Sequence, residues 1–102
     1  SEQTLWAAAV AAEPTNAFAH VCYAECAADR RVAERHYKLA LVNSPSDGIR
    51  FAAINNLAAL YLSDAQPTKA MIWARQAVAM QPRHPAAQFN LARAKRALAQ
   101  RP

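Results

Sequence analysis

Cysteine and histidine side chains come closest to forming a chemical site in this 102-residue sequence. Cys22 and Cys26 lie four residues apart, with His20 and His36 nearby in the chain. Thiolate and imidazole are the usual zinc ligands, so one interpretation is a soft-metal or redox site. Zinc motifs, however, place their cysteines across a turn and add a second ligand pair, which the sequence lacks. We therefore expect the cysteines to be small packing residues of one helix, with no metal and no cofactor.

A disulfide between Cys22 and Cys26 is disfavoured by the geometry of a helix. Side chains four residues apart have Cβ atoms about 5–6 Å apart, whereas a disulfide needs about 3.5–4.5 Å. Two free thiols favour a reducing compartment such as the cytoplasm, and a periplasmic location stays open.

The residues that could perform acid–base or nucleophilic catalysis are isolated from one another in the sequence. The candidate bases and nucleophiles are His20, His36, His84, Ser44, Ser46 and Ser63. None of these serines lies in the context of a nucleophile elbow, and His84 is most simply a solvent-exposed turn residue. The single glycine, Gly48, also excludes the Gly-rich loops that hold nucleotide phosphates. We expect that the protein is not an enzyme and has no small-molecule substrate.

The charge of the chain is basic, with 12 Lys and Arg against 7 Asp and Glu and a formal net charge of +5. Basic residues gather near the end of the sequence: Arg93, Lys95, Arg96 and Arg101. A nucleic-acid footprint is conceivable, but no aromatic residues alternate with this cluster to stack on bases. We instead expect the charge to attract an acidic protein segment, or to keep a terminal helix soluble.

Composition predicts an all-α fold, because alanine is abundant while β-branched and aromatic residues are sparse. Residues that favour helix caps or turns are Thr15 or Asn16, Asp29, Ser46 or Asp47, and Asp64. The expected helices span approximately residues 2–13, 15–27, 30–43, 47–63, 67–81 and 84–100. The longest apolar run, 5–12, is too short to cross a bilayer, so no membrane segment is predicted.

Three prolines divide the chain at similar distances. Pro14, Pro45 and Pro82 each follow a helix-like run, and proline is favoured there because it cannot continue a helix. Pro45 lies 31 residues after Pro14 and 37 before Pro82, so the mean spacing is 34. Each proline is preceded, five residues earlier, by an alanine: Ala9, Ala40 and Ala77. The pattern indicates an internal helical repeat.

The best repeat carries a known pattern of large and small residues. Its first helix and its second helix, with the proline that follows, supply Ile54, Leu57, Ala58, Tyr61, Ala70, Ala74 and Pro82. This resembles the tetratricopeptide repeat, W-x2-L-G-x2-Y, then A-x3-F and P, at a period near 34. Tyr61 and Pro82 match outright, whereas isoleucine and two alanines replace the Trp, Gly and Phe. Ala24, Ala58 and Ala92 occupy the small position at which the family often has Gly.

The resemblance implies an α-solenoid of antiparallel helix pairs that forms one domain over residues 1–102. Its parts would be the second helix of a partial repeat (1–14), two repeats (15–45 and 46–82) and a capping helix (83–102). Lys95 replaces the tyrosine of the pattern in this last helix, as suits a polar cap.

The resemblance also implies a protein-interaction module whose first helices line a concave groove for a partner's peptide or helix. The residues expected to contact the partner are Phe18, Cys22, Asn55, Asn56, Ala59, Phe89, Asn90 and Arg93, with Val21, Glu25 and Ala52 beside them. The amides of Asn56 and Asn90 suit the backbone of an extended ligand. A bridge between neighbouring helices is the alternative role for both.

Other interpretations of the groove stay open or are disfavoured by single residues. Family members that clamp chaperone carboxylates carry Lys and Arg beside Asn on this face. Here Asn56 is present, but Glu25 and Ala86 occupy matching places, which disfavours that ligand. Self-association through a face that includes Trp6 is one alternative. A role as an accessory domain of a larger membrane or secretion protein is another.

Overall fold

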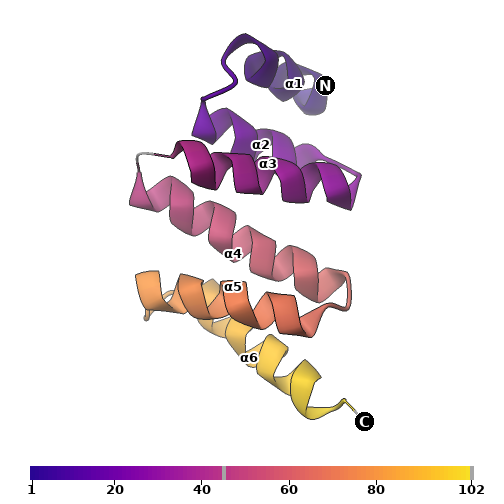
Figure 1. Cartoon of the computed structure of the whole chain (residues 1–102), viewed down its shortest axis with the longest axis vertical. Coiled ribbons are helices and arrows are strands. Elements are labelled where there is room, and N and C mark those ends of the chain that lie inside the picture. Colours follow the sequence, from indigo (N-terminus) through magenta and orange to yellow (C-terminus); the bar gives the residue numbers. More distant parts are fainter. Residues whose placement is uncertain (45, 102) are drawn as a thin grey trace. The chain divides into compact units, whose positions relative to one another are not determined.

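The computed structural model describes residues 1–44 and 46–101, which form helices and no strand. The elements are α1 (Glu2–Ala12), α2 (Ala17–Cys26), α3 (Arg30–Asn43), α4 (Asp47–Ser63), α5 (Pro67–Met80) and α6 (Pro85–Ala99). An all-α fold with six helices is thus confirmed for this part of the chain (Figure 1). Pro45, expected to follow the third helix, lies outside the described residues. Across the described ranges, every helix is too short or too polar to span a membrane.

Short-range hydrogen bonds explain where several helices begin. Asn16 Oδ1 and Asp29 Oδ1 accept bonds of 3.0 Å and 2.8 Å from backbone N–H groups in the first turns of α2 and α3. Asn16, rather than Thr15, is therefore the N-cap of α2, because its side chain satisfies an N–H that has no helical partner. His84 caps α6 in the same way through Nδ1. His84 therefore caps a helix, whereas the sequence suggested only a solvent-exposed turn residue.

The first compact unit, Ser1–Ala53, contains α1, α2, α3 and the start of α4. Helix α2 packs on both α1 and α3, in the indigo-to-magenta part of Figure 1. The buried apolar side chains of α2 and α3 are mainly alanines, namely Ala17, Ala19, Ala24, Ala33 and Ala40, joined by Val21 and Tyr37. Methyl side chains let the two helix backbones approach closely, while Tyr37 fills the adjoining space.

The second compact unit, Ile54–Pro102, contains the rest of α4 with α5 and α6. Helix α5 packs on α6, and α4 contacts α5 where Lys69 Nζ lies 5.6 Å from the centre of the Tyr61 ring. The core of this second unit also consists mainly of fully buried alanines: Ala58, Ala70, Ala74, Ala77, Ala87 and Ala94. Leu57 is the largest side chain with no exposure in this unit.

The small position of the repeat pattern is not equivalent in all three places. Ala24 and Ala58 are buried, as expected for contacts between helices, but Ala92 is exposed together with Lys95. At Ala92 the small side chain therefore lies at the surface of α6. Helix α6 is the last described element, so no described helix covers this side of it.

The turn between α4 and α5 adopts a backbone conformation that favours glycine. Ala65 has φ 54°, and no other non-glycine residue in 1–44 and 46–101 has a positive φ. Gln66 N–H donates to the Tyr61 carbonyl and Ala65 N–H donates to the Leu62 carbonyl, the two bonds of a Schellman ending. At a positive φ the Cβ of Ala65 lies too close to the backbone, which makes this conformation unfavourable for alanine.

We predict that Ala65→Gly raises the free energy of unfolding by about 0.5–1 kcal/mol, because glycine adopts a positive φ without strain. The control is Ala92→Gly, at an exposed position within α6, which should lower it by about 0.5–1 kcal/mol. Urea denaturation followed by circular dichroism measures both changes. Equal destabilisation by the two substitutions would contradict the assignment of strain to Ala65.

Candidate functional site

Two phenylalanines expected to contact a partner are exposed at the surface, one in each unit. Phe18 of α2 is 55% exposed and Phe89 of α6 is 61% exposed. The ring of Trp6 stands edge-on to Phe18, with centroids 5.8 Å apart and an interplanar angle of 82°. The guanidinium carbon of Arg93 lies 5.6 Å from the centroid of Phe89. Each unit therefore presents an aromatic ring that has both an exposed surface and a defined neighbour.

The other residues assigned to the partner surface lie at different depths. Four are half-buried: Cys22, Asn55, Asn56 and Ala59. Of the residues placed beside them, Ala52 is half-buried, Glu25 is exposed and Val21 is buried. The expectation that Val21 projects from this face is therefore wrong, because its side chain belongs to the core of the first unit.

Asn90 uses its amide inside the second unit. The residue is 7% exposed, and its Nδ2 donates to Asn55 Oδ1 at 3.1 Å and to the Asn55 carbonyl at 3.5 Å. These bonds join α6 to α4, which is the bridging role that the sequence left open. The contact of Asn90 with a partner stays a prediction.

We predict that Asn90→Ala lowers the free energy of unfolding by about 1 kcal/mol, because it removes a hydrogen bond between helices at a buried position. Asn56→Ala is the matched control at a half-buried position, where we expect less than about 0.5 kcal/mol. Chemical denaturation of both variants checks the difference. If the two losses are equal, the Asn90–Asn55 bond contributes nothing specific to stability.

A second group of polar side chains lies inside the first unit, where two of the candidate histidines meet. His20 is 2% exposed, and its Nδ1 lies 2.9 Å from Nδ1 of His36. The other nitrogen of His20, Nε2, lies 2.6 Å from the carbonyl oxygen of Pro14. The imidazole rings stack with centroids 5.1 Å apart, and Tyr23 packs edge-on to His36. We name these two residues the histidine pair.

The surroundings of His36 favour its uncharged imidazole. Burial lowers the pKa of His36 below its ordinary value, and the positive charges of His20, when protonated, and Arg35 lower it further. Sequence reasoning singled out both histidines as possible ligands or bases but missed their bond. The position of His36 in its helix could have indicated that it lies near the core, because Ala33, Tyr37 and Ala40 of α3 form a buried face beside it.

The cysteines do not assemble a metal centre with these histidines. Among residues 1–44 and 46–101, no three His, Cys, Asp or Glu side chains lie close enough to hold a metal ion together. Cys22 and Cys26 are half-buried free thiols. Burial raises the pKa of the Cys22 thiol, and the neighbouring Glu25 raises it further. Both effects disfavour the thiolate that metal binding and redox chemistry require.

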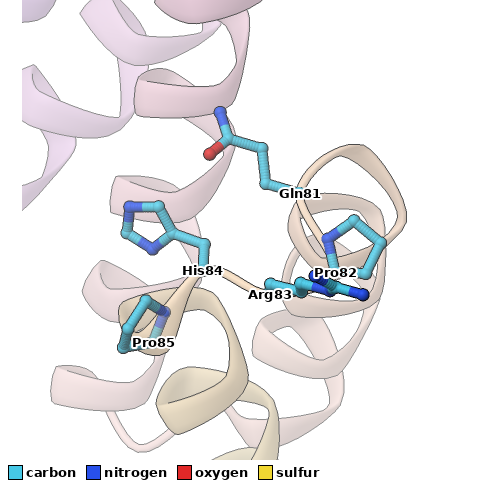
Figure 2. A pocket seen from close by; sticks show the side chains of 5 residues that line it. All are labelled: Gln81, Pro82, Arg83, His84 and Pro85. Carbon is cyan, nitrogen blue, oxygen red and sulfur yellow. The ribbon is translucent and has the colours of Figure 1, made fainter.

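A shallow pocket of about 540 Å³ lies at the turn between α5 and α6. Figure 2 shows the side chains of Gln81, Pro82, Arg83, His84 and Pro85 around it. His84 accepts the hydrogen bond that caps α6, so the pocket lies beside the beginning of that helix.

Comparisons with known proteins give this chain no relative. No protein-family model, no curated protein and no solved structure matches it. The resemblance to the tetratricopeptide repeat therefore stays a prediction from the sequence pattern.

Proposed function

We propose that this chain is a helical-repeat module of tetratricopeptide type that binds an acidic, apolar segment of a partner protein. Support for the repeat comes from burial at the positions of the pattern. Six of these positions are buried: Ile54, Leu57, Ala58, Tyr61, Ala70 and Ala74. The packing of α2 on α3 and of α5 on α6 is consistent with a series of helix pairs. In such a module the first helix of each repeat presents the binding residues.

The observation that carries the proposed binding is the exposed Phe89 ring with Arg93 beside it. Burying a phenylalanine side chain contributes about 1.5–3 kcal/mol, so an exposed ring is a strong anchor for an apolar ligand side chain. The Arg93 guanidinium is 5.6 Å from the ring centre, and it supplies donors in a geometry that suits a carboxylate. A ligand with an acidic residue close to an apolar one satisfies both groups.

The net charge and the first unit support the same kind of ligand. The chain carries a formal net charge of +5, which accelerates encounter with an acidic partner and makes binding dependent on salt. In the first unit, Phe18 packs against Trp6 and still exposes more than half of its surface. This aromatic pair is a second anchor for apolar ligand side chains.

We predict that a random peptide library, selected on the immobilised chain, yields peptides in which acidic residues flank Leu, Ile or Phe. Phe89→Ala should weaken the binding of a selected peptide at least about tenfold, because it removes an apolar anchor. Arg93→Gln should weaken binding less and should reduce its dependence on salt. Fluorescence anisotropy at two salt concentrations measures both effects.

The matched controls are exposed apolar residues on the second helices of the predicted repeats. Ile72→Ala in α5 and Val42→Ala in α3 remove side chains that are at least half exposed, and they should change the affinity less than about twofold. Equal losses at Phe89 and Ile72 would contradict the proposal, as would selected peptides without acidic residues. Sedimentation separates the alternative, because a dimer that Trp6→Ala dissociates would indicate self-association instead.

A further inference from the structure

The hydrogen bonds of the histidine pair fix where its protons lie. A carbonyl oxygen only accepts, so the contact with Pro14 requires a proton on Nε2 of His20. In neutral His20, Nδ1 is then an acceptor. The proton between the two Nδ1 atoms therefore belongs to His36. One tautomer of each neutral ring satisfies the whole arrangement.

The same geometry accepts one further proton but not two. Singly charged His20 donates from Nε2 to Pro14 and from Nδ1 to His36, whose own proton moves to Nε2. A second added proton places N–H groups on both Nδ1 atoms, which are 2.9 Å apart. Two donors then face each other and two positive charges meet at a site where His20 is 2% exposed. This state is incompatible with the bond between the rings.

The histidine pair joins three segments of the first unit. Pro14 belongs to the turn between α1 and α2, His20 to α2 and His36 to α3. Tyr23 of α2 packs edge-on to His36. Loss of the Nδ1 bond therefore removes the hydrogen bond between α2 and α3, whereas the bond of His20 Nε2 to Pro14 does not depend on it.

Charged groups near His36 disfavour its protonation. From α3, the positive charge of Arg35 acts on His36. From α4, Arg50 donates from Nη1 to the Leu41 carbonyl of α3. Over residues 1–44 and 46–101, neither imidazole is hydrogen-bonded to a carboxylate that would stabilise an added proton.

We propose that the histidine pair makes the packing of α2 on α3 sensitive to pH, holding the helices together when neutral and releasing them on full protonation. In the unfolded chain each histidine binds its proton independently, with an ordinary pKa near 6.5. The unfolded state therefore binds more protons in acid, and the folded state loses stability as the pH falls. Because the pKa of His36 is lowered on folding, this loss begins near pH 6.5 and continues through the lower folded value.

The test uses His84→Asn as the parent variant, because asparagine preserves an N-cap side chain and removes the remaining histidine. Urea denaturation is measured from pH 7.5 to pH 5 with a chelator present. We expect the folding equilibrium constant to fall about tenfold per pH unit between pH 6 and 5, which corresponds to one extra proton on the unfolded chain. Adding His36→Gln, whose amide donates to His20 without titrating, should reduce the fall to less than about threefold. If His36→Gln leaves the pH dependence of the folding equilibrium constant the same as in the parent variant, the proposal is overturned.

Nuclear magnetic resonance of the parent variant provides a test that does not require His36→Gln to fold. Ring ¹⁵N shifts at pH 7.5 should identify the Nε2–H tautomer of His20 and the Nδ1–H tautomer of His36. A coupling between the two Nδ1 nuclei should be visible across the hydrogen bond. The pair should take up a single proton while the native spectrum persists. Two rings that titrate independently in the folded protein would overturn the proposal.

Discussion

The helices of this chain approach one another closely at alanine positions, and this close approach determines how the other side chains pack. Ala40, Ala77 and Ala94 are fully buried in three different helices. A methyl group at such a position allows short distances between helix axes, and larger side chains such as Tyr61 fill the space beside it. Alanine itself buries little apolar area, so stability comes from the density of packing rather than from a few large side chains.

In a core built from alanine, the few buried polar side chains have a large effect on how the helices are arranged. Some large apolar side chains remain at the surface. His20 and Asn90 are buried, and each forms a hydrogen bond to another helix of its own unit. Within a low-dielectric interior these bonds select one arrangement of the helices, because any other leaves a polar group unsatisfied. Phe18 and Phe89, by contrast, lie outside the core and are exposed. The same packing therefore accounts both for the buried hydrogen bonds and for the exposed aromatic rings.

Features that depend on neighbouring residues could be predicted from the sequence, while contacts between distant residues could not. Helix positions followed from alanine content and proline spacing, and Asp29 followed from the local chemistry of caps. The bonds of His20 with His36 and of Asn55 with Asn90 join residues that are 16 and 35 positions apart. A repeat pattern predicts which helix face a residue occupies but not which of its atoms meet a partner. The burial of Val21 likewise depends on how the helices of the first unit pack, which the repeat pattern does not determine.

Alanine is required where the helices meet, and two leucine substitutions within α5 test this requirement. Ala77 is fully buried and Ala79 is exposed. Because both lie in the same helix, replacing alanine by leucine changes the helix propensity by a similar amount at the two positions. The measurement is the free energy of unfolding of Ala77→Leu and Ala79→Leu by urea denaturation. We predict a loss of about 1–3 kcal/mol for Ala77→Leu from overpacking and a change within about 0.5 kcal/mol for Ala79→Leu. Equal stability of the two variants would contradict the account.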